Sequence, residues 1–217
     1  MIIDNDKMER LFLTSSVSGV VKKIARQIGT KARGMRLAFI DTAAEVEEGD
    51  KWWLRDDRAA LADVGFDVFD YTVTGKAAHN VRKDLARVDV IFVSGGNTFY
   101  LLQQLQRCNG LSIIRERITG GVLYMGSSAG SIIAGPDIEP VRTIDNAVKA
   151  PKLKDTKGLG LVDFVVFPHW GSDSFRKVYL QERLAHAYTT KHKIILLTDR
   201  QYIRVEGEMY RIEEVKK

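Results

Sequence analysis

The chain contains one cysteine, Cys108, so no disulfide can form within it, and this scarcity of thiols is typical of reducing compartments. No stretch approaches the ~18 consecutive apolar residues that a membrane-spanning helix needs. The first residues are too acidic, and their apolar run is too short, for a secretory signal. The sequence therefore predicts a cytoplasmic protein with no membrane partner.

A large excess of one charge is also missing. The chain has 33 Lys and Arg residues and 28 Asp and Glu residues, which gives a net charge of +5. The two signs are mixed along the chain. Basic stripes interleaved with aromatic residues are absent, so we expect no nucleic-acid partner. No repeat and no linker rich in proline, glycine or serine interrupts the 217 residues. We expect one domain over residues 1–217.

Apolar runs of strand length alternate with segments of helical period, which predicts an α/β fold with a doubly wound, mostly parallel sheet between two layers of helices. The expected strands are residues 10–14, 35–40, 66–71, 89–93, 122–125, 164–167, 194–198, 202–205 and 209–212. The last two are expected to form a C-terminal β-hairpin. The expected helices are residues 17–28, 51–64, 83–86 and 98–108. Trp52 and Trp53 are expected in the core, with a dimer contact as the alternative.

The most informative stretch is GSSAG at residues 126–130, between an apolar strand and a run that can open a helix. Small residues around Ser128 fit a sharp turn that holds the central residue in a strained conformation with its side chain outward. Such a turn presents a nucleophile at a site where negative charge can be stabilised. The alternative is a glycine-rich turn that packs tightly or holds a phosphate.

A serine hydroxyl needs a base, and usually an acid that orients the base. His169 follows the core strand at residues 164–167 and is the expected base. The other histidines are expected at the surface: His79, His186 and His192. For the acid, Asp199 at a strand end and Asp145 on a loop rank almost level, and Asp173 ranks behind them.

Acyl transfer also needs donors for the oxyanion, and the amides of Ala129 and of a glycine in the segment at residues 94–98, SGGNT, are candidates. The alternative for this segment is a phosphate-gripping loop with Asn97 or Thr98 as the helix cap. It lacks the Gly-Lys-Ser/Thr of a nucleotide-binding loop, so a nucleotide site is weakly supported.

Three motifs in order, SGGNTF at residues 94–99, GSSAG at 126–130 and FPH at 167–169, resemble the serine peptidase family that contains aspartyl dipeptidase (dipeptidase E) and cyanophycinase. The resemblance covers most of the chain. It implies a flavodoxin-like sheet akin to the class I glutamine amidotransferase domain, and hydrolysis of a peptide bond without metal or cofactor.

By the same resemblance, Ser128 is the nucleophile, His169 the base, and Gly96 with Ala129 the oxyanion donors. The third triad member of this family has been placed at positions that match either Asp145 or Asp199, so the resemblance leaves that choice open.

Substrate preference follows from the dipeptidase of that family, which requires an N-terminal aspartate and hence a cationic group in its pocket. Arg142 is the first candidate, with Arg176 and Arg200 as alternatives, and Asn97 and Thr98 are also expected to contact the substrate. We expect an exopeptidase or dipeptidase that acts on short, including N-terminal-Asp, peptides as a monomer or homodimer. The alternatives are an α/β-hydrolase-type esterase and a non-catalytic module that binds a small molecule or a partner.

Overall fold

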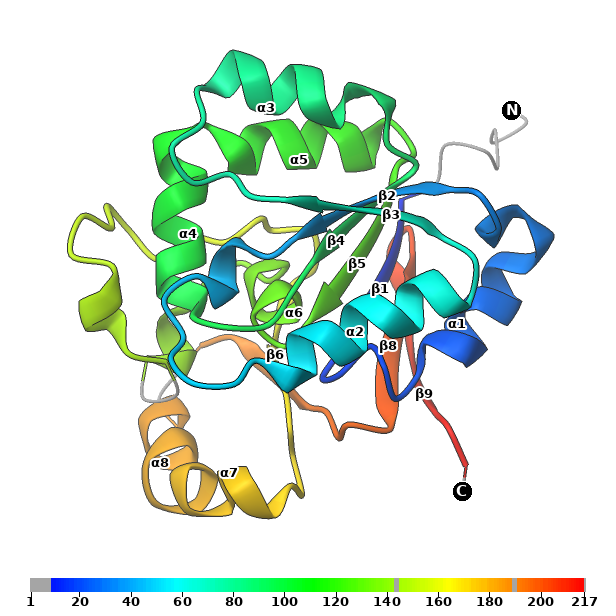
Figure 1. Cartoon of the computed structure of the whole chain (residues 1–217). Coiled ribbons are helices and arrows are strands. Elements are labelled where there is room, and N and C mark those ends of the chain that lie inside the picture. The colour runs from blue at the N-terminus through cyan, green and yellow to red at the C-terminus, as the bar shows by residue number, and fades with distance from the viewer. Residues whose placement is uncertain (1–8, 143–144, 189–190, 217) are drawn as a thin grey trace.

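A seven-stranded sheet forms the centre of the molecule in the computed structural model, which describes residues 9–142, 145–188 and 191–216 (Figure 1). The strand order is β3-β2-β4-β5-β1-β8-β9. The strands are β1 (Arg10–Thr14), β2 (Arg36–Ile40), β3 (Asp67–Tyr71), β4 (Val90–Val93), β5 (Leu123–Ser127), β8 (Gln201–Glu206) and β9 (Met209–Glu214). The first five are parallel, whereas β8 pairs antiparallel with both β1 and β9. The predicted fold class and the C-terminal hairpin are confirmed.

Two further strands, β6 (Phe164–Phe167) and β7 (Lys193–Leu196), form a separate parallel pair. This separate pair was not foreseen from the sequence; the position beside β1 in the main sheet is taken by β8. All nine strands nevertheless begin and end within two residues of the predicted bounds.

Helices cover both faces of the sheet. The helices are α1 (Val21–Ile28), α2 (Trp52–Asp63), α3 (Ala78–Asp84), α4 (Thr98–Arg107), α5 (Gly110–Thr119), α6 (Ala129–Ile133), α7 (Asp173–Val178) and α8 (Leu184–Ala187), with a π-helical turn at Tyr179–Arg183. Alternation along β2 explains the two layers, because successive strand side chains point to opposite faces. Leu37 and Phe39 pack with α1 and α2, whereas Ala38 and Ile40 pack with α3, α4, α5 and α6.

The helix predictions were less accurate than the strand predictions. Residues 98–108 match α4, but the helix expected at residues 83–86 lies earlier, as α3, and α5, α7 and α8 were not foreseen. The core prediction is wrong for Trp52, which is 59% exposed at the start of α2, while Trp53 is half-buried.

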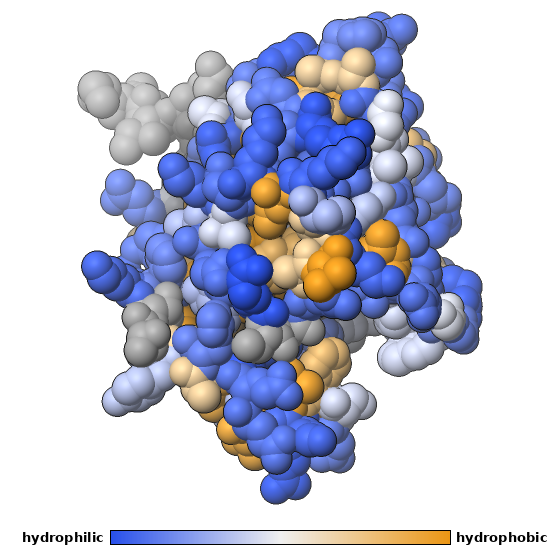
Figure 2. Space-filling view, turned by 90° about the vertical axis from the view of Figure 1, so that its left-hand side faces the viewer, coloured by the Kyte–Doolittle hydropathy of each residue, from blue (hydrophilic) through white to orange (hydrophobic). Residues whose placement is uncertain are grey.

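Large exposed apolar side chains are scattered among several elements: Trp52, Val148, Leu180, Tyr188, Met209, Tyr210 and Ile212. Figure 2 shows one face of the molecule, which is mostly hydrophilic with small apolar patches. Among the described residues, no helix is both long and apolar enough to cross a bilayer.

Candidate active site

The turn between β5 and α6 has the strained geometry expected from its sequence. Ser128 adopts φ 49° and ψ −108°, a conformation that is rare for a residue with a side chain. Its amide donates to the carbonyl of Thr14 at 3.0 Å, which ties the turn to β1. A Cβ on Gly130 would lie 2.0 Å from the carbonyl oxygen of Val93, and one on Gly126 would lie 2.6 Å from the backbone of Gly130. The glycines are therefore required by close backbone contact.

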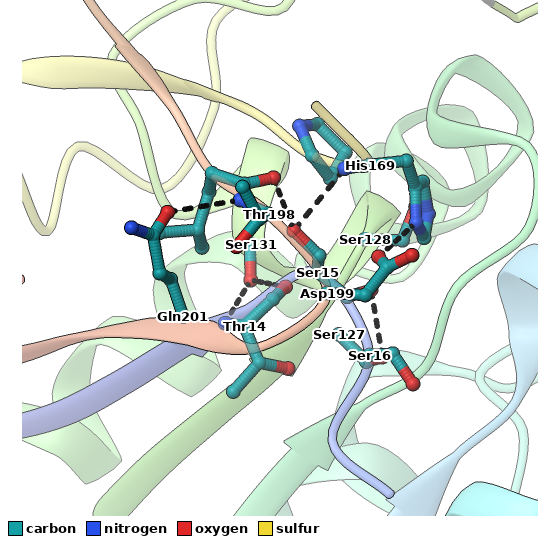
Figure 3. A network of polar contacts seen from close by, with 12 residues as sticks. Thr14, Ser15, Ser16, Ser127, Ser128, Ser131, His169, Thr198, Asp199 and Gln201 are labelled. Carbon is teal, nitrogen blue, oxygen red and sulfur yellow. Dashed lines mark hydrogen bonds and ion pairs between the residues drawn. The ribbon is translucent and has the colours of Figure 1, made fainter. Parts of the chain in front are cut away.

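The side chain of Ser128 points to the imidazole of His169 (Figure 3). The distance between Ser128 Oγ and His169 Nε2 is 3.1 Å. On the other side of the ring, His169 Nδ1 lies 2.6 Å from Oδ1 of Asp199. The ring stacks on Phe175, with centroids 4.7 Å apart and planes inclined by 14°. Serine, histidine and aspartate thus form one continuous chain of hydrogen bonds.

His169 and Asp199, which complete the hydrogen-bond chain to Ser128, both follow strands of the small sheet. His169 follows β6 and Asp199 follows β7, and the carboxyl ends of neighbouring parallel strands lie side by side. The turn that carries Asp199 is held by Gln201, whose side-chain oxygen accepts from the amide of Thr198 at 3.1 Å. Gly19 abuts the same turn, since its Cβ would lie 2.7 Å from the carbonyl oxygen of Asp199.

Asp145, which the sequence ranks level with Asp199, occupies a different place. Its Oδ2 accepts from the amide of Thr98 at 2.9 Å, at the N-terminus of α4. Burial raises the pKa of Asp145, and the hydrogen bond from the amide of Thr98 opposes this shift. The carboxylate that contacts His169 Nδ1 is that of Asp199.

The glycine pair before α4 lies against the serine, as the sequence suggests. A Cβ on Gly95 would lie 3.3 Å from Cβ of Ser128 and 3.5 Å from the ring of Trp53. Gly96 has φ +122°, and a Cβ there would lie 2.3 Å from the carbonyl oxygen of Ala43. Within the described ranges, the amides of Gly96 and Ala129 donate to no other protein group, so both are available to an oxyanion.

Asn97 and Thr98 are buried at the start of α4. Asn97 Oδ1 accepts from the amide of Tyr100 at 2.9 Å, which is the expected cap, and its Nδ2 donates to the carbonyl of Asn146 at 3.1 Å. The structure thus gives both residues a structural task at the helix end. Substrate contact by either of them stays a prediction.

The three candidate arginines differ in their surroundings. Arg142 pairs with both carboxylate oxygens of Glu139 at 2.6 and 2.7 Å on the surface, and Arg200 donates to the carbonyl of Val215 at 2.7 and 3.1 Å. Arg176 lines a cavity of about 310 Å³, which is also lined by Trp170, the residue that follows His169. The other residues of this cavity are Gly171, Ser172, Asp173, Tyr179 and Leu180.

The remaining histidines form no hydrogen bond with Ser128, His169 or Asp199 that the described residues show. His79 and His186 are exposed, as predicted, while His192 is half-buried with Nε2 3.6 Å from Oδ2 of Asp137. Among the described residues, no three His, Cys, Asp or Glu side chains are grouped to hold a metal ion.

Two buried charged residues near the site were missed from the sequence. Asp57 of α2 accepts from the hydroxyl of Ser127 at 2.8 Å and from the amide of Ser18 at 3.0 Å, and burial raises its pKa. Arg183 is fully buried with its guanidinium 3.9 Å from the ring centroid of Tyr179, and burial lowers its pKa. Both lie in segments rich in charge, so nothing in the pattern marks them as buried.

Comparisons with known proteins agree with the geometry. The sequence model of Peptidase family S51 matches residues 11–213. The "Uncharacterized peptidase Lmo0363" of Listeria monocytogenes is 33% identical over 201 residues, which cover 93% of this chain and 96% of that protein. A "Peptidase E" of Streptomyces coelicolor is 33% identical over 183 residues, covering 81% of this chain and 70% of the relative.

Solved structures show the same fold. A crystal structure of a candidate Peptidase E from Listeria monocytogenes superposes with a TM-score of 0.88 at 31% identity, covering 96% of this chain and all of that one. A peptidase from an acI-B1 Actinobacterium shares the fold with a TM-score of 0.67 at 18% identity, covering 97% and 89% of the two chains. Because the family match spans nearly the whole sequence, this protein belongs to Peptidase family S51 and is a serine-type peptidase.

Proposed function

We propose that this peptidase cleaves short peptides through an acyl-enzyme on Ser128, with His169 as general base and Asp199 as the acid that orients it. The observation that carries the proposal is the hydrogen-bond chain from Asp199 Oδ1 through the imidazole to Ser128 Oγ, with links of 2.6 and 3.1 Å. It has the arrangement and the roles of a Ser-His-Asp triad.

In the first half of the reaction, Asp199 accepts a hydrogen bond from the Nδ1–H of His169, which leaves the Nε2 lone pair facing Ser128. Nε2 takes the hydroxyl proton as Oγ bonds to the substrate carbonyl carbon. The carbonyl oxygen becomes an oxyanion that accepts from the amides of Gly96 and Ala129. The imidazolium then protonates the leaving amine, and the peptide C–N bond breaks.

In the second half, a water molecule takes the place of the amine. His169 accepts one of its protons while the water oxygen attacks the ester carbon. Collapse of this second oxyanion breaks the bond to Oγ, and the imidazolium returns a proton to Ser128. The cycle ends with a free carboxylic acid and the enzyme in its starting state.

For the substrate we propose a short peptide that begins with aspartate. The cavity lined by Trp170, the residue that follows His169, has a volume near 310 Å³ and includes both Arg176 and Asp173. A cation and an anion in one small cavity complement an N-terminal aspartate, which carries a carboxylate and an ammonium group. The relatives named "Peptidase E" are consistent with a peptide substrate.

The test begins with Ser128→Ala. We expect hydrolysis of Asp-x dipeptides to fall by at least about 10³-fold because the attacking atom is gone, with an unchanged melting temperature. A fluorophosphonate probe should label the parent at Ser128 and leave the variant unlabelled. Full activity in the variant would refute the nucleophile assignment, and short esters cleaved in preference to every peptide would favour the esterase alternative. A parent that neither reacts with the probe nor cleaves peptides would favour a binding module.

Arg176→Gln tests the substrate preference separately. We expect KM for Asp-x dipeptides to rise about tenfold or more, since a charge-assisted hydrogen bond is lost, while Ala-x dipeptides are cleaved as before. An equal effect on both classes of dipeptide would contradict recognition of aspartate by Arg176.

A further inference from the structure

The proposed catalytic residues stand on two sheets that share no strand pairing. Ser128 follows β5 of the large sheet, whereas His169 and Asp199 follow β6 and β7 of the small one. The distance between Ser128 Oγ and His169 Nε2 therefore depends on contacts that join the two sheets. Backbone ladders within either sheet cannot set it.

Ser15 makes such a contact at the carboxyl end of β1. Its side chain is buried, and its hydroxyl donates to the carbonyl of Leu197 at 2.7 Å and accepts from the amide of His169 at 3.1 Å. Leu197 lies two residues before Asp199. One hydroxyl thus holds the backbone of both loops that carry the partners of Ser128 (Figure 3).

The preceding residue holds the nucleophile itself. The carbonyl of Thr14 accepts from the amide of Ser128 at 3.0 Å. Thr14, the last residue of β1, and Ser15, which follows it, therefore bond to the backbone at Ser128 and at His169. The end of β1 thus fixes the backbone positions of Ser128 and His169 relative to each other.

The backbone of His169 has particular need of such a contact. Its φ is +63°, in the left-handed region that non-glycine residues rarely adopt. A residue in this region is kept there by its surroundings. The hydrogen bond from its amide to Ser15 Oγ is a direct restraint on that conformation, and the amide of Trp170 adds a second one through Leu197 O at 3.0 Å.

We propose that Ser15 is a positioning residue for the peptidase reaction: its hydroxyl joins the His169 and Asp199 loops to β1 and so keeps His169 Nε2 within hydrogen-bond reach of Ser128. The inference rests on the proposed function, in which these three residues are the triad. Ser15 touches no reacting atom, so its removal should change the rate of the chemical step and leave substrate affinity nearly unchanged.

The test compares Ser15→Ala with Thr42→Val. Thr42 is an equally buried hydroxyl that accepts a backbone amide, that of Val73 at 3.0 Å, but it lies after β2 and joins no catalytic loop. Both variants leave one buried amide without its acceptor and should lower the melting temperature to a similar extent. We expect kcat to fall about 10- to 100-fold in Ser15→Ala with KM within about twofold, because misplacement of a catalytic group by about 1 Å costs up to about 100-fold.

Two further readouts separate positioning from general damage. The rate of fluorophosphonate labelling at Ser128 should fall in parallel with kcat in Ser15→Ala, and stay within about threefold of the parent in Thr42→Val. Ser15→Thr, which retains the hydroxyl, should recover most of the rate.

The outcomes are decisive in both directions. A folded Ser15→Ala variant with kcat and labelling within about threefold of the parent would overturn the proposal, as would an equal loss in Thr42→Val at equal melting temperature. If Ser15→Ala does not fold, the kcat of Ser15→Thr decides. A folded Ser15→Thr variant whose kcat is about 10- to 100-fold below that of the parent would contradict the role of the hydroxyl, because the hydroxyl is still present. An active Ser128→Ala would instead refute the proposed function on which the inference depends.

Discussion

Asp199→Asn and Asp145→Asn should differ in their effect on the rate: the first should slow the reaction strongly, whereas the second should leave it nearly unchanged. Asp199 contacts His169 Nδ1 at 2.6 Å, so an amide there can present an N–H to the ring and favour the tautomer that cannot accept from Ser128. Asp145 caps the amide of Thr98 and contacts no atom of the imidazole in a hydrogen bond. We therefore propose that Asp199 takes part in the chemistry and that Asp145 caps the helix.

The size of the Asp199 effect follows from its exposure. Loss of the aspartate from a fully buried triad lowers kcat by about 10⁴-fold. The side chain of Asp199 is 45% exposed, so water can replace part of its interaction with the ring. We expect kcat to fall by about 10²- to 10³-fold, which corresponds to roughly 3–4 kcal/mol of transition-state stabilisation.

The Asp145→Asn variant should unfold almost as the parent does. Asparagine keeps an oxygen that can accept from Thr98, and asparagine and aspartate are similar helix caps, so we expect the free energy of unfolding to change by less than about 1 kcal/mol. We expect kcat to change by less than about tenfold. The measurements are initial rates on an Asp-x dipeptide and urea midpoints for both variants. A large rate loss in Asp145→Asn together with a nearly normal Asp199→Asn would refute the assignment.

Three more outcomes are expected. Gly130→Ala should destabilise the fold by about 3 kcal/mol or more, since the new methyl group would lie 2.0 Å from the carbonyl oxygen of Val93 in a fixed strand; a normal urea midpoint would contradict this. Burial raises the pKa of Asp57 and Asp145, so the folded state binds their protons more tightly than the unfolded state, and the destabilisation they cause at neutral pH is lost as pH falls toward 3.8. Urea midpoints measured at neutral pH and again close to pH 3.8 should therefore rise more on acidification in the parent than in a variant with Asn at both positions. Arg142→Ala should change KM for Asp-x dipeptides by less than about twofold and stability by at most about 1 kcal/mol, because its surface ion pair with a neighbouring glutamate is solvated; a large rise in KM would return it to the substrate site.

The sequence located the strands and the serine turn because their signals are local. A run such as Phe164–Phe167 is apolar throughout, and such a strand is buried on both faces. The glycines around Ser128 are close to it in sequence, and they report a backbone contact that any such turn requires. The position of His169 after a core strand was enough to separate it from the other histidines.

The choice between the two aspartates needed three dimensions. Asp199 lies 30 residues from His169, and their contact depends on the pairing of β6 with β7. Nothing in the local sequence distinguishes a carboxylate that faces an imidazole from one that caps a helix. The same applies to Asp57, whose neighbours Asp56 and Arg58 make the segment look like a solvated helix face.

The helical segment after His169 was missed for another physical reason. Tyr179 and Arg183 are both buried, and they begin and end a π-helical turn. In a π-helical turn, the residues that share one face are spaced differently from those of an α-helix. One of the buried positions is filled by an arginine, so apolar residues do not mark the inner face and the 3.6-residue pattern fails.

The antiparallel pairing of β8 explains how the three residues of the proposed triad, which are divided between two sheets, come to lie together. Thr14, at the carboxyl end of β1, lies opposite Ser127 of β5 and also opposite Tyr202 of β8. Since β8 runs against β1, it is the beginning of β8 that reaches this edge, and the turn before it carries Asp199. A parallel β8 would present its far end here and would carry Asp199 to the opposite edge of the sheet. The change of strand direction at β1, which interrupts an otherwise parallel sheet, is thus what brings the aspartate to the same edge as the serine.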